Sequence, residues 1–312
     1  MSTPFGSEKI ISHKIDSGEL STFLVGFDLE DNGQKAYRIK PLVQKLTDVI
    51  HEFAFGFHEN QTTNNTETLS KLIEAAKSIY KVDSFSKVKD IYAGNGSIED
   101  DVEDKYLRRG EFGELILHLL LRDFYKTIPL LSKIYFKDSF GHTVHGFDAV
   151  HIHEETKTLW LGESKIYKDG KAGLRALIQD IHEHFKSDYL ESEFLLISKK
   201  VKHFDNIPEK DHWLDVMSKT SKLSEQLNTI NIPLLCTYNC SLFSEYSDEN
   251  SEEFLGAYIN EMRELKSYFD ASNDHPLKTN LNIILILFPV QDKVDLVKRL
   301  HNKLSILQSL GE

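Results

Sequence analysis

The hydrophobic positions in the first hundred residues predict one strand followed by two helices. The strand covers residues 19–27. A helix begins near Pro41, because proline suits the first turn of a helix. The apolar positions that follow the helical period are Leu42, Val43, Leu46, Val49, Ile50 and Phe53. Residues 69–79 show the same period, so this part of the chain is predicted to be a small α+β unit.

Turn-forming residues and like charges separate this unit from the rest of the chain. Residues 94–97 are Gly-Asn-Gly-Ser, and an acidic run over residues 99–104 follows them. Both features are typical of a hinge or an exposed linker. We therefore predict an N-terminal α+β domain over residues 1–100, which could dock a partner, and a second domain over residues 101–312.

From Tyr106 onward, the pattern predicts helices alternating with strands. A helix over residues 107–125 precedes three strands at 132–137, 145–153 and 158–166, joined by polar turns as in an antiparallel meander. The later elements expected are helices at 172–185, 213–227, 254–269 and 294–307, and strands at 193–201, 232–238 and 281–288. This alternation predicts an α/β layer structure, and the last strand is apolar enough to be buried on both faces.

A lone acid and an acid-x-lysine motif fall on two consecutive predicted strands. Asp148 lies in the strand at 145–153, and Glu163 and Lys165 lie in the next one. Side chains alternate along a strand, so Glu163 and Lys165 share a face while Ser164 points away. Across a hairpin of this length, Asp148 can lie beside or diagonal to Glu163.

This constellation predicts a metal-dependent phosphodiesterase. Asp148, Glu163 and the backbone carbonyl of Ser164 are the oxygen ligands that a hard divalent cation prefers. Lys165 can orient the attacking water or offset charge that builds up on the phosphate. The expected cofactor is Mg2+, for which Mn2+ can substitute.

The helix before the hairpin adds acidic candidates. Glu111, Glu114, His118 and Arg122 form a polar stripe on an otherwise apolar helix. Facing a buried sheet, such a stripe needs a positive counterpart, which a metal or Lys165 would supply. Glu114 is the better candidate to complete the metal shell, because large apolar residues surround its turn. Glu111 lies nearer the end and can equally serve the helix dipole, so the choice between them stays open.

The helix after the acid-x-lysine strand carries a basic flank. Lys171, Arg175 and Gln179 recur on one face of this helix, and Lys168 precedes it. We predict that these four side chains contact a DNA backbone beside the metal. A solvated helix face would show the same pattern.

Net charge limits how this protein could bind nucleic acid. The chain of 312 residues has 49 acidic and 37 basic side chains, a net charge of -12. This argues against coating nucleic acid over a broad surface, because such binding depends on neutralising phosphates. Binding in one basic groove, or delivery of DNA by a partner, stays possible.

Other patterns favour a cytoplasmic protein without a zinc site. No apolar run is long enough to span a membrane, and the N-terminus lacks the layout of a secretory signal, so no membrane partner is expected. Cys236 and Cys240 have no further ligands at zinc-site spacing and are expected to be reduced thiols. His145, His151 and His153 alternate onto the strand face opposite Asp148, which disfavours a metal role for them.

The order of these elements resembles the PD-(D/E)xK nucleases, whose restriction-endonuclease-like core is a mixed sheet flanked by helices. The segments RRGEFGELILHLLL, HGFDAVHI, LWLGESKIY and FPVQDKVDLVKRLHNKL resemble the DUF1837 family, with the resemblance covering roughly Tyr106 to the C-terminus. That family includes HamA, the nuclease subunit of the Hachiman anti-phage defence system, and the related AbpA-type proteins. The proline usual before the first acid is replaced here by Phe147.

The resemblance implies an activity and a partner. It implies a Mg2+-dependent deoxyribonuclease in bacterial antiviral immunity, working with a superfamily 2 helicase, which is HamB in Hachiman. Such a helicase would load DNA onto an acidic nuclease that has only one modest basic patch.

Two other interpretations fit the same residues. A non-catalytic clamp or sensor that regulates a helicase would use the acidic pocket only structurally. A two-carboxylate glycosidase would use Asp148 and Glu163, but an adjacent lysine is more useful beside a phosphate than beside a sugar. The sequence leaves open DNA or RNA as substrate, strand preference, endo- or exonucleolytic action, the activation trigger and the stoichiometry with the helicase.

Overall fold

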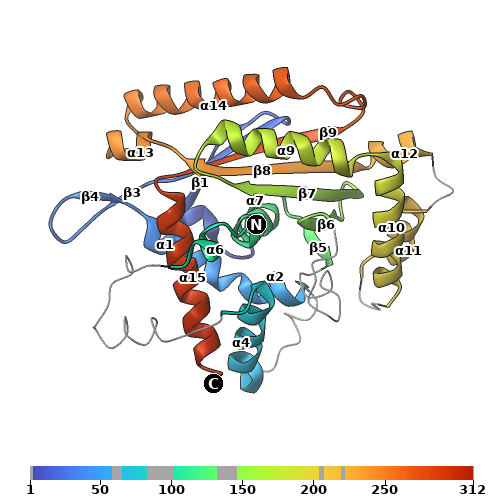
Figure 1. The fold of residues 1–312 in the computed structure, drawn as a ribbon, viewed down its shortest axis with the longest axis horizontal. Helices are drawn as coiled ribbons and strands as arrows, with labels where there is room; N and C mark the ends of the chain where they lie inside the picture. Colours follow the sequence, from blue (N-terminus) through green and yellow to red (C-terminus); the bar gives the residue numbers. More distant parts are fainter. Residues whose placement is uncertain are drawn as a thin grey trace.

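A seven-stranded mixed sheet runs through the middle of the molecule (Figure 1). The computed structural model describes residues 3–57, 65–82, 102–131, 146–203, 207–218 and 222–311. In spatial order the strands are β1 (Ile11–Asp16), β2 (Leu20–Val25), β9 (Asn282–Val290), β8 (Ile230–Asn239), β7 (Thr158–Ile166), β6 (Ala149–His153) and β5 (Ile128–Leu131). The run from β2 to β7 is parallel, and the outer pairs at both edges are antiparallel. The predicted α/β architecture with a mixed sheet flanked by helices is confirmed.

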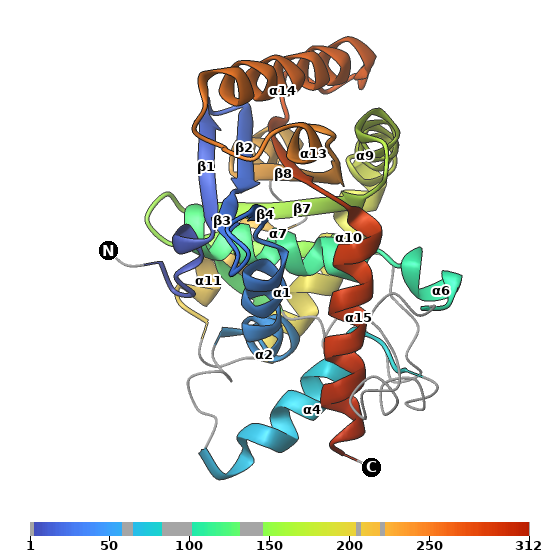
Figure 2. The same ribbon diagram turned by 90° about the vertical axis from the view of Figure 1, so that its left-hand side faces the viewer.

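Helices cover both faces of this sheet (Figures 1 and 2). On one face lie α9 (Gly170–His184) and α14 (Glu252–Ser272), and on the other lies α7 (Glu111–Phe124). Gly113 of α7 sits against the Ser164 side chain of β7, and Gly173 of α9 sits against Cys236 of β8. Because helices cover both faces, the central parallel strands are buried and almost wholly apolar.

A second group of helices lies beyond α7 (Figure 2). These are α1 (Ile39–Asp48), α2 (Ile50–Phe55), α4 (Thr68–Ile79) and the C-terminal α15 (Lys293–Ser309). The other elements are η1 (Ser7–Lys9), β3 (Phe27–Leu29), β4 (Lys35–Tyr37), η2 (Asn65–Glu67), α6 (Asp104–Leu107), α10 (Ser187–Lys202), α11 (Lys210–Val216), α12 (Leu223–Asn228) and α13 (Leu242–Glu245). The strands β3 and β4 form a separate two-stranded sheet.

The first hundred residues contribute to the same sheet as the rest of the chain. Strand β2 pairs in parallel with β9, with Leu20 opposite Leu285, and β1 adds at the edge. The two segments on either side of the predicted boundary near residue 100 therefore contribute strands to one sheet. The turn-forming residues 94–97 and the start of the acidic run lie outside the described residues.

Several of the predicted elements are wrong. The helix predicted from Pro41 through Phe53 is two helices, α1 and α2, which meet at Val49. Residues 193–201 were expected to form a strand but belong to helix α10. The buried positions Leu190, Phe194, Ile197 and Val201 follow a helical period that a short apolar run does not reveal. The helix predicted at 213–227 is two helices, α11 and α12. The predicted strand at 132–137 lies outside the described residues.

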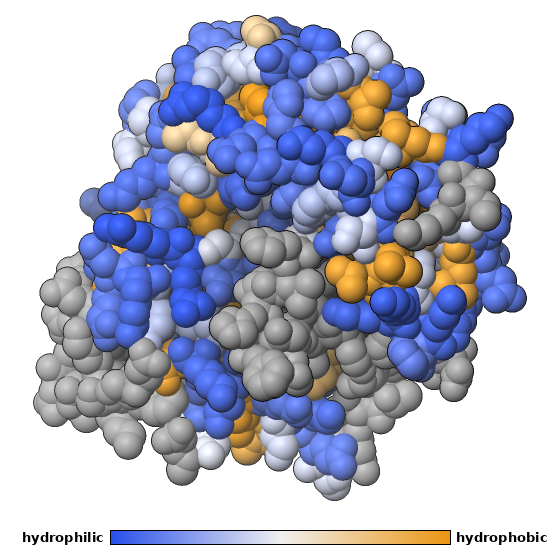
Figure 3. Space-filling view, turned by 45° about the vertical axis from the view of Figure 1, so that its right-hand side comes forward, coloured by the Kyte–Doolittle hydropathy of each residue, from blue (hydrophilic) through white to orange (hydrophobic). Residues whose placement is uncertain are grey.

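The face in Figure 3 is largely hydrophilic, with small and separate hydrophobic patches. Large apolar side chains that the described residues expose include Leu29, Leu69 and Leu195. They come from β3, α4 and α10, which are far apart in the sequence. Single exposed apolar side chains of this kind are normal on a globular protein.

The close approach of α9 to β8 gives a stability prediction. A Cβ atom on Gly173 would lie 2.6 Å from the Cys236 sulfur, whereas one on Gly256 of α14 would meet nothing within 4 Å. We expect Gly256→Ala to stabilise the protein by about 0.5–1 kcal/mol through helix propensity. Gly173→Ala should instead destabilise it by about 1–3 kcal/mol through overpacking. Urea unfolding of both variants measures the difference, and equal stability would contradict the packing described.

Candidate active site

Asp148 is attached to β7 through its side chain. Strand β6 begins at Ala149, which pairs with Gly162, so Asp148 stands one step beyond the last backbone pair, at the level of Glu163. One Asp148 oxygen, Oδ2, accepts hydrogen bonds from both the backbone N–H and the hydroxyl of Ser164, each at 2.8 Å. The predicted position in the middle of a strand is therefore corrected to its end. There the Asp148 carboxylate accepts the Ser164 N–H of β7, in the place of a backbone carbonyl from β6.

Glu163 and Lys165 both point toward helix α9. The Glu163 Oε1 atom lies 2.6 Å from Nδ1 of His184, and the Lys165 ammonium lies 2.5 Å from Oδ2 of Asp180. Between them, Ser164 faces α7 on the other side of the sheet. This is the alternation expected of a strand.

Asp180 and His184 were missed from the sequence. They are four residues apart on α9, so they share one face of the helix. The helix starts just after β7, where the Asp169 side chain caps it by accepting the Ala172 N–H at 2.7 Å. A sequence signal did exist: an acid and a histidine at this spacing flank the apolar stripe of the first helix after the motif.

Asp148, Glu163, Lys165, Asp180 and His184 form a cluster with an excess of acid, in which Glu163 is buried and the other four residues are half-buried. Burial raises the pKa of Glu163 well above its usual value, and the charges of Asp148 and Asp180 raise it further. Burial opposes the charge of Lys165, but the ion pair with Asp180 outweighs it and leaves the lysine pKa raised. The lysine therefore stays protonated, and the carboxyl of Glu163 is hard to ionise unless a cation is near.

Glu114 interacts electrostatically with Glu163 of this cluster. It is buried in the first turn of α7, and its charge contributes to the raised pKa of Glu163. Glu111, one turn earlier, has its carboxylate 2.7 Å from the Arg109 guanidinium. Of the two acids that the sequence left open, Glu114 is the one that is among the main influences on the pKa of Glu163, and its role as a ligand stays a prediction.

The donor atoms at this place suit a hard cation. Asp148 and Glu163 offer carboxylate oxygens and Ser164 a backbone carbonyl, the donor types that Mg2+ and Mn2+ prefer. Within the described ranges, no three His, Cys, Asp or Glu side chains are grouped so that they could enclose a metal ion. Mg2+ seldom uses such a cage, because it keeps several waters and binds through one or two carboxylates and substrate phosphates. The residues are therefore of the right kind for an open site.

The predicted DNA-contacting residues lie on another side of α9. Lys168, Lys171, Arg175 and Gln179 are all exposed. The Arg175 guanidinium donates to the Tyr268 hydroxyl of α14 at 3.2 Å, and the Lys171 ammonium lies 5.6 Å from the same ring. Lys171 and Asp180 are separated by about two and a half helical turns, so they project from opposite sides. The basic flank thus faces α14 and solvent, whereas Asp180 and His184 on the opposite side of α9 contact β7.

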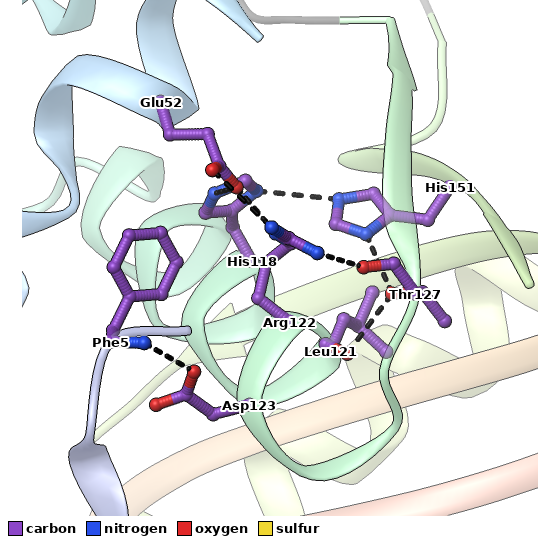
Figure 4. A network of polar contacts seen from close by, with 8 residues as sticks. All are labelled: Phe5, Glu52, His118, Leu121, Arg122, Asp123, Thr127 and His151. Atoms are coloured by element: carbon purple, nitrogen blue, oxygen red, sulfur yellow. Dashed lines mark hydrogen bonds and ion pairs between the residues drawn. The ribbon is translucent and has the colours of Figure 1, made fainter. Parts of the chain in front are cut away.

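The rest of the polar stripe on α7 serves a different network (Figure 4). The Arg122 guanidinium donates to Glu52 of α2 at 2.5 Å and to the Thr127 carbonyl at 2.6 Å. Nε2 of His118 lies 3.4 Å from the same Glu52 carboxylate. Burial opposes ionisation of Glu52, but His118 and Arg122 outweigh it and leave its pKa lowered. This buried ion pair ties the N-terminal segment to the helix that carries Glu114.

Hydrogen bonds in this network fix the state of a buried histidine. The Thr127 hydroxyl donates to the Leu121 carbonyl at 3.0 Å, so it accepts from Nδ1 of His151 at 2.8 Å. Nε2 of His151 is then free to accept from Nδ1 of His118 at 3.3 Å. Burial and the positive charges of His118 and Arg122 lower the pKa of His151 well below its usual value, which keeps it neutral. His151 is thus structural, in agreement with its predicted place away from Asp148.

The fold and this cluster together define a class of protein. It is an α/β protein whose mixed sheet brings a lone acid and an acid-x-lysine motif together under a covering helix. The chain belongs to the HamA family, whose family model matches residues 3–304. The predicted resemblance to HamA is confirmed, and it extends across the N-terminal segment, where it had been expected only from Tyr106 onward. The DUF1837 and AbpA relations stay predictions.

Two further findings are negative. None of the curated proteins compared with the chain matches it. In the part of the chain that the structure describes, the helices are all too short or too polar to cross a lipid bilayer.

Proposed function

We propose that this protein is a metal-dependent deoxyribonuclease that acts with a superfamily 2 helicase, HamB-like, in Hachiman anti-phage defence. The single observation that carries the proposal is the convergence of Asp148, Glu163 and Lys165. Asp148 is bonded to Ser164, the residue between the other two, and its charge acts on both of them. Membership of the HamA family supports the role in defence.

Each residue has a role that its surroundings support. Asp148 and Glu163, with the Ser164 carbonyl, would hold Mg2+. Glu114 would complete the shell through water, because no three acids among the described residues are grouped closely enough to hold one ion together. Mg2+ bound there would lower the pKa of the attacking water and neutralise charge on the scissile phosphate. Lys165, kept charged by Asp180, holds the water or stabilises the charge that develops on the phosphate.

The electrostatics of the chain support a partner that delivers DNA. A protein with a net charge of -12 repels a polyanion at long range, and the cluster itself is acidic. A helicase that feeds DNA into the site would remove the need for a broad basic surface. In this proposal Lys168, Lys171, Arg175 and Gln179, exposed on the other side of α9, contact phosphates other than the scissile one.

Cleavage of DNA by the purified chain tests this proposal. We expect plasmid and linear DNA to be cut with Mg2+ or Mn2+, alone or with the helicase, and to stay intact with EDTA. Glu163→Gln should lose cleavage, because a neutral amide is a poor ligand for a hard cation. A chain that neither binds these metals in titration calorimetry nor cuts DNA with its helicase would be a non-catalytic subunit instead.

A further inference from the structure

Two side chains of α9 each contact one residue of the acid-x-lysine motif. His184 contacts Glu163 at 2.6 Å, and Asp180 contacts Lys165 at 2.5 Å. One face of a single helix therefore meets both motif residues that point away from α7. The close packing of Gly173 on Cys236 fixes the helix against the sheet, and this fixes the positions of Asp180 and His184 relative to β7.

The imidazole of His184 is held in place on two sides. Its ring stacks on Tyr189 of α10 with centroids 4.6 Å apart and planes 13° apart. Phe147, next to Asp148, meets it edge-on at 5.8 Å. With a cation bound, Glu163 would be ionised, and its carboxylate could then only accept a hydrogen bond, which the Nδ1–H of His184 would donate. That contact occupies Oε1 and leaves Oε2 available to a cation.

Asp180 acts on Lys165 in a comparable way. Its side chain is 15% exposed and that of Lys165 is 25% exposed, so the pair is shielded from water. A flexible lysine side chain has many rotamers, and the carboxylate of Asp180 selects the one that lies beside the cluster. Without Asp180 the ammonium would be free to swing toward solvent.

We propose that His184 and Asp180 are positioning residues for the proposed nuclease, His184 orienting Glu163 for the metal and Asp180 orienting Lys165 for the phosphate. This inference rests on the proposed function. Partners that hydrogen-bond a metal ligand fix its orientation, and their loss lowers metal affinity by about 10–100-fold. The two residues should therefore differ in effect: His184 governs metal affinity, whereas Asp180 governs turnover.

Mn2+ titration calorimetry on the full chain tests the role of His184. His184→Ala should weaken Mn2+ binding by about 10–100-fold. His184→Asn should recover part of the affinity, because the asparagine amide can place a donor where Nδ1 stood. The matched control is Glu183→Ala, which removes an exposed carboxylate on the same helix that accepts from Gln179. This variant should bind Mn2+ as the wild type does.

The variant Asp180→Asn tests whether Asp180 positions Lys165. It should leave Mn2+ affinity within about threefold of the wild type while kcat for DNA cleavage falls by about tenfold or more, because the lysine loses its partner whereas Asp148 and Glu163 keep their hydrogen bonds. Circular dichroism and thermal melts confirm that each variant is folded before its binding is compared.

Each contrary result would lead to a different conclusion. If the wild type does not bind Mn2+ at all, the proposed function fails and this inference fails with it. If the wild type binds and folded His184→Ala binds as tightly, only the role of His184 is overturned. If His184→Ala loses Zn2+ much more than Mg2+, the imidazole is a ligand itself and the positioning role is overturned, because imidazole suits Zn2+ better than Mg2+.

Discussion

Lys165→Ala is expected to slow Mg2+-dependent DNA cleavage by about 100- to 1,000-fold, the effect of removing one preorganised charge-stabilising group from an active site. The structure gives two reasons for a loss of this size. The ammonium is half-buried beside Glu163, where its interaction with a phosphate is weakly screened. Its position is set by Asp180, so water cannot replace it with the same geometry.

Single-turnover cleavage of a labelled duplex, with the helicase present, measures this effect. The control is Lys222→Ala, whose side chain is 79% exposed and should leave the rate unchanged. Lys165→Arg keeps the charge but brings a larger, planar group, and it should restore only part of the activity. A folded Lys165→Ala protein that cuts at the wild-type rate would remove this lysine from the mechanism.

Arg122→Met is expected to destabilise the protein by about 3–5 kcal/mol, because it leaves a buried carboxylate without its main partner. Arg122 and Glu52 have side-chain exposures of 6% and 3%, and the guanidinium also satisfies the Thr127 carbonyl. Methionine fills a similar volume but donates no hydrogen bond, so both acceptors lose their donor.

Urea denaturation provides the measurement, and two variants sharpen it. Arg108→Met removes a solvent-exposed pair with Asp104 and should cost less than about 1 kcal/mol. Combining Arg122→Met with Glu52→Gln should recover part of the stability, because the unpaired charge is then removed. If Arg122→Met proves no more harmful than Arg108→Met, the Figure 4 network does not stabilise the fold.

Local patterns in the sequence were sufficient to predict the strand faces of the site. Alternation alone placed Glu163 and Lys165 on one side of β7 and Ser164 on the other. It could not predict that the side chain of Asp148 bonds to Ser164, because that depends on where the β6–β7 pairing ends. The metal, the DNA contacts and the helicase stay predictions.

What the sequence did not reveal depends on contacts between distant residues. The pairing of β2 with β9 joins the two ends of the chain, and no local period indicates it. The apolar run in α10 fits a strand or a buried helix equally well until its packing is known. Nothing local in the sequence distinguishes His184 from His182, and the placement of α9 on β7 is what brings His184 to Glu163.

The neighbours of β2 also set the order in which the protein can be built. Leu20 lies opposite Leu285, so the first strands cannot take their final place until the ribosome has made β9. Such distant pairings fold slowly, and a growing chain must keep its early strands from other partners until then. The first strands of this protein therefore reach their final neighbours only when nearly the whole chain has been translated.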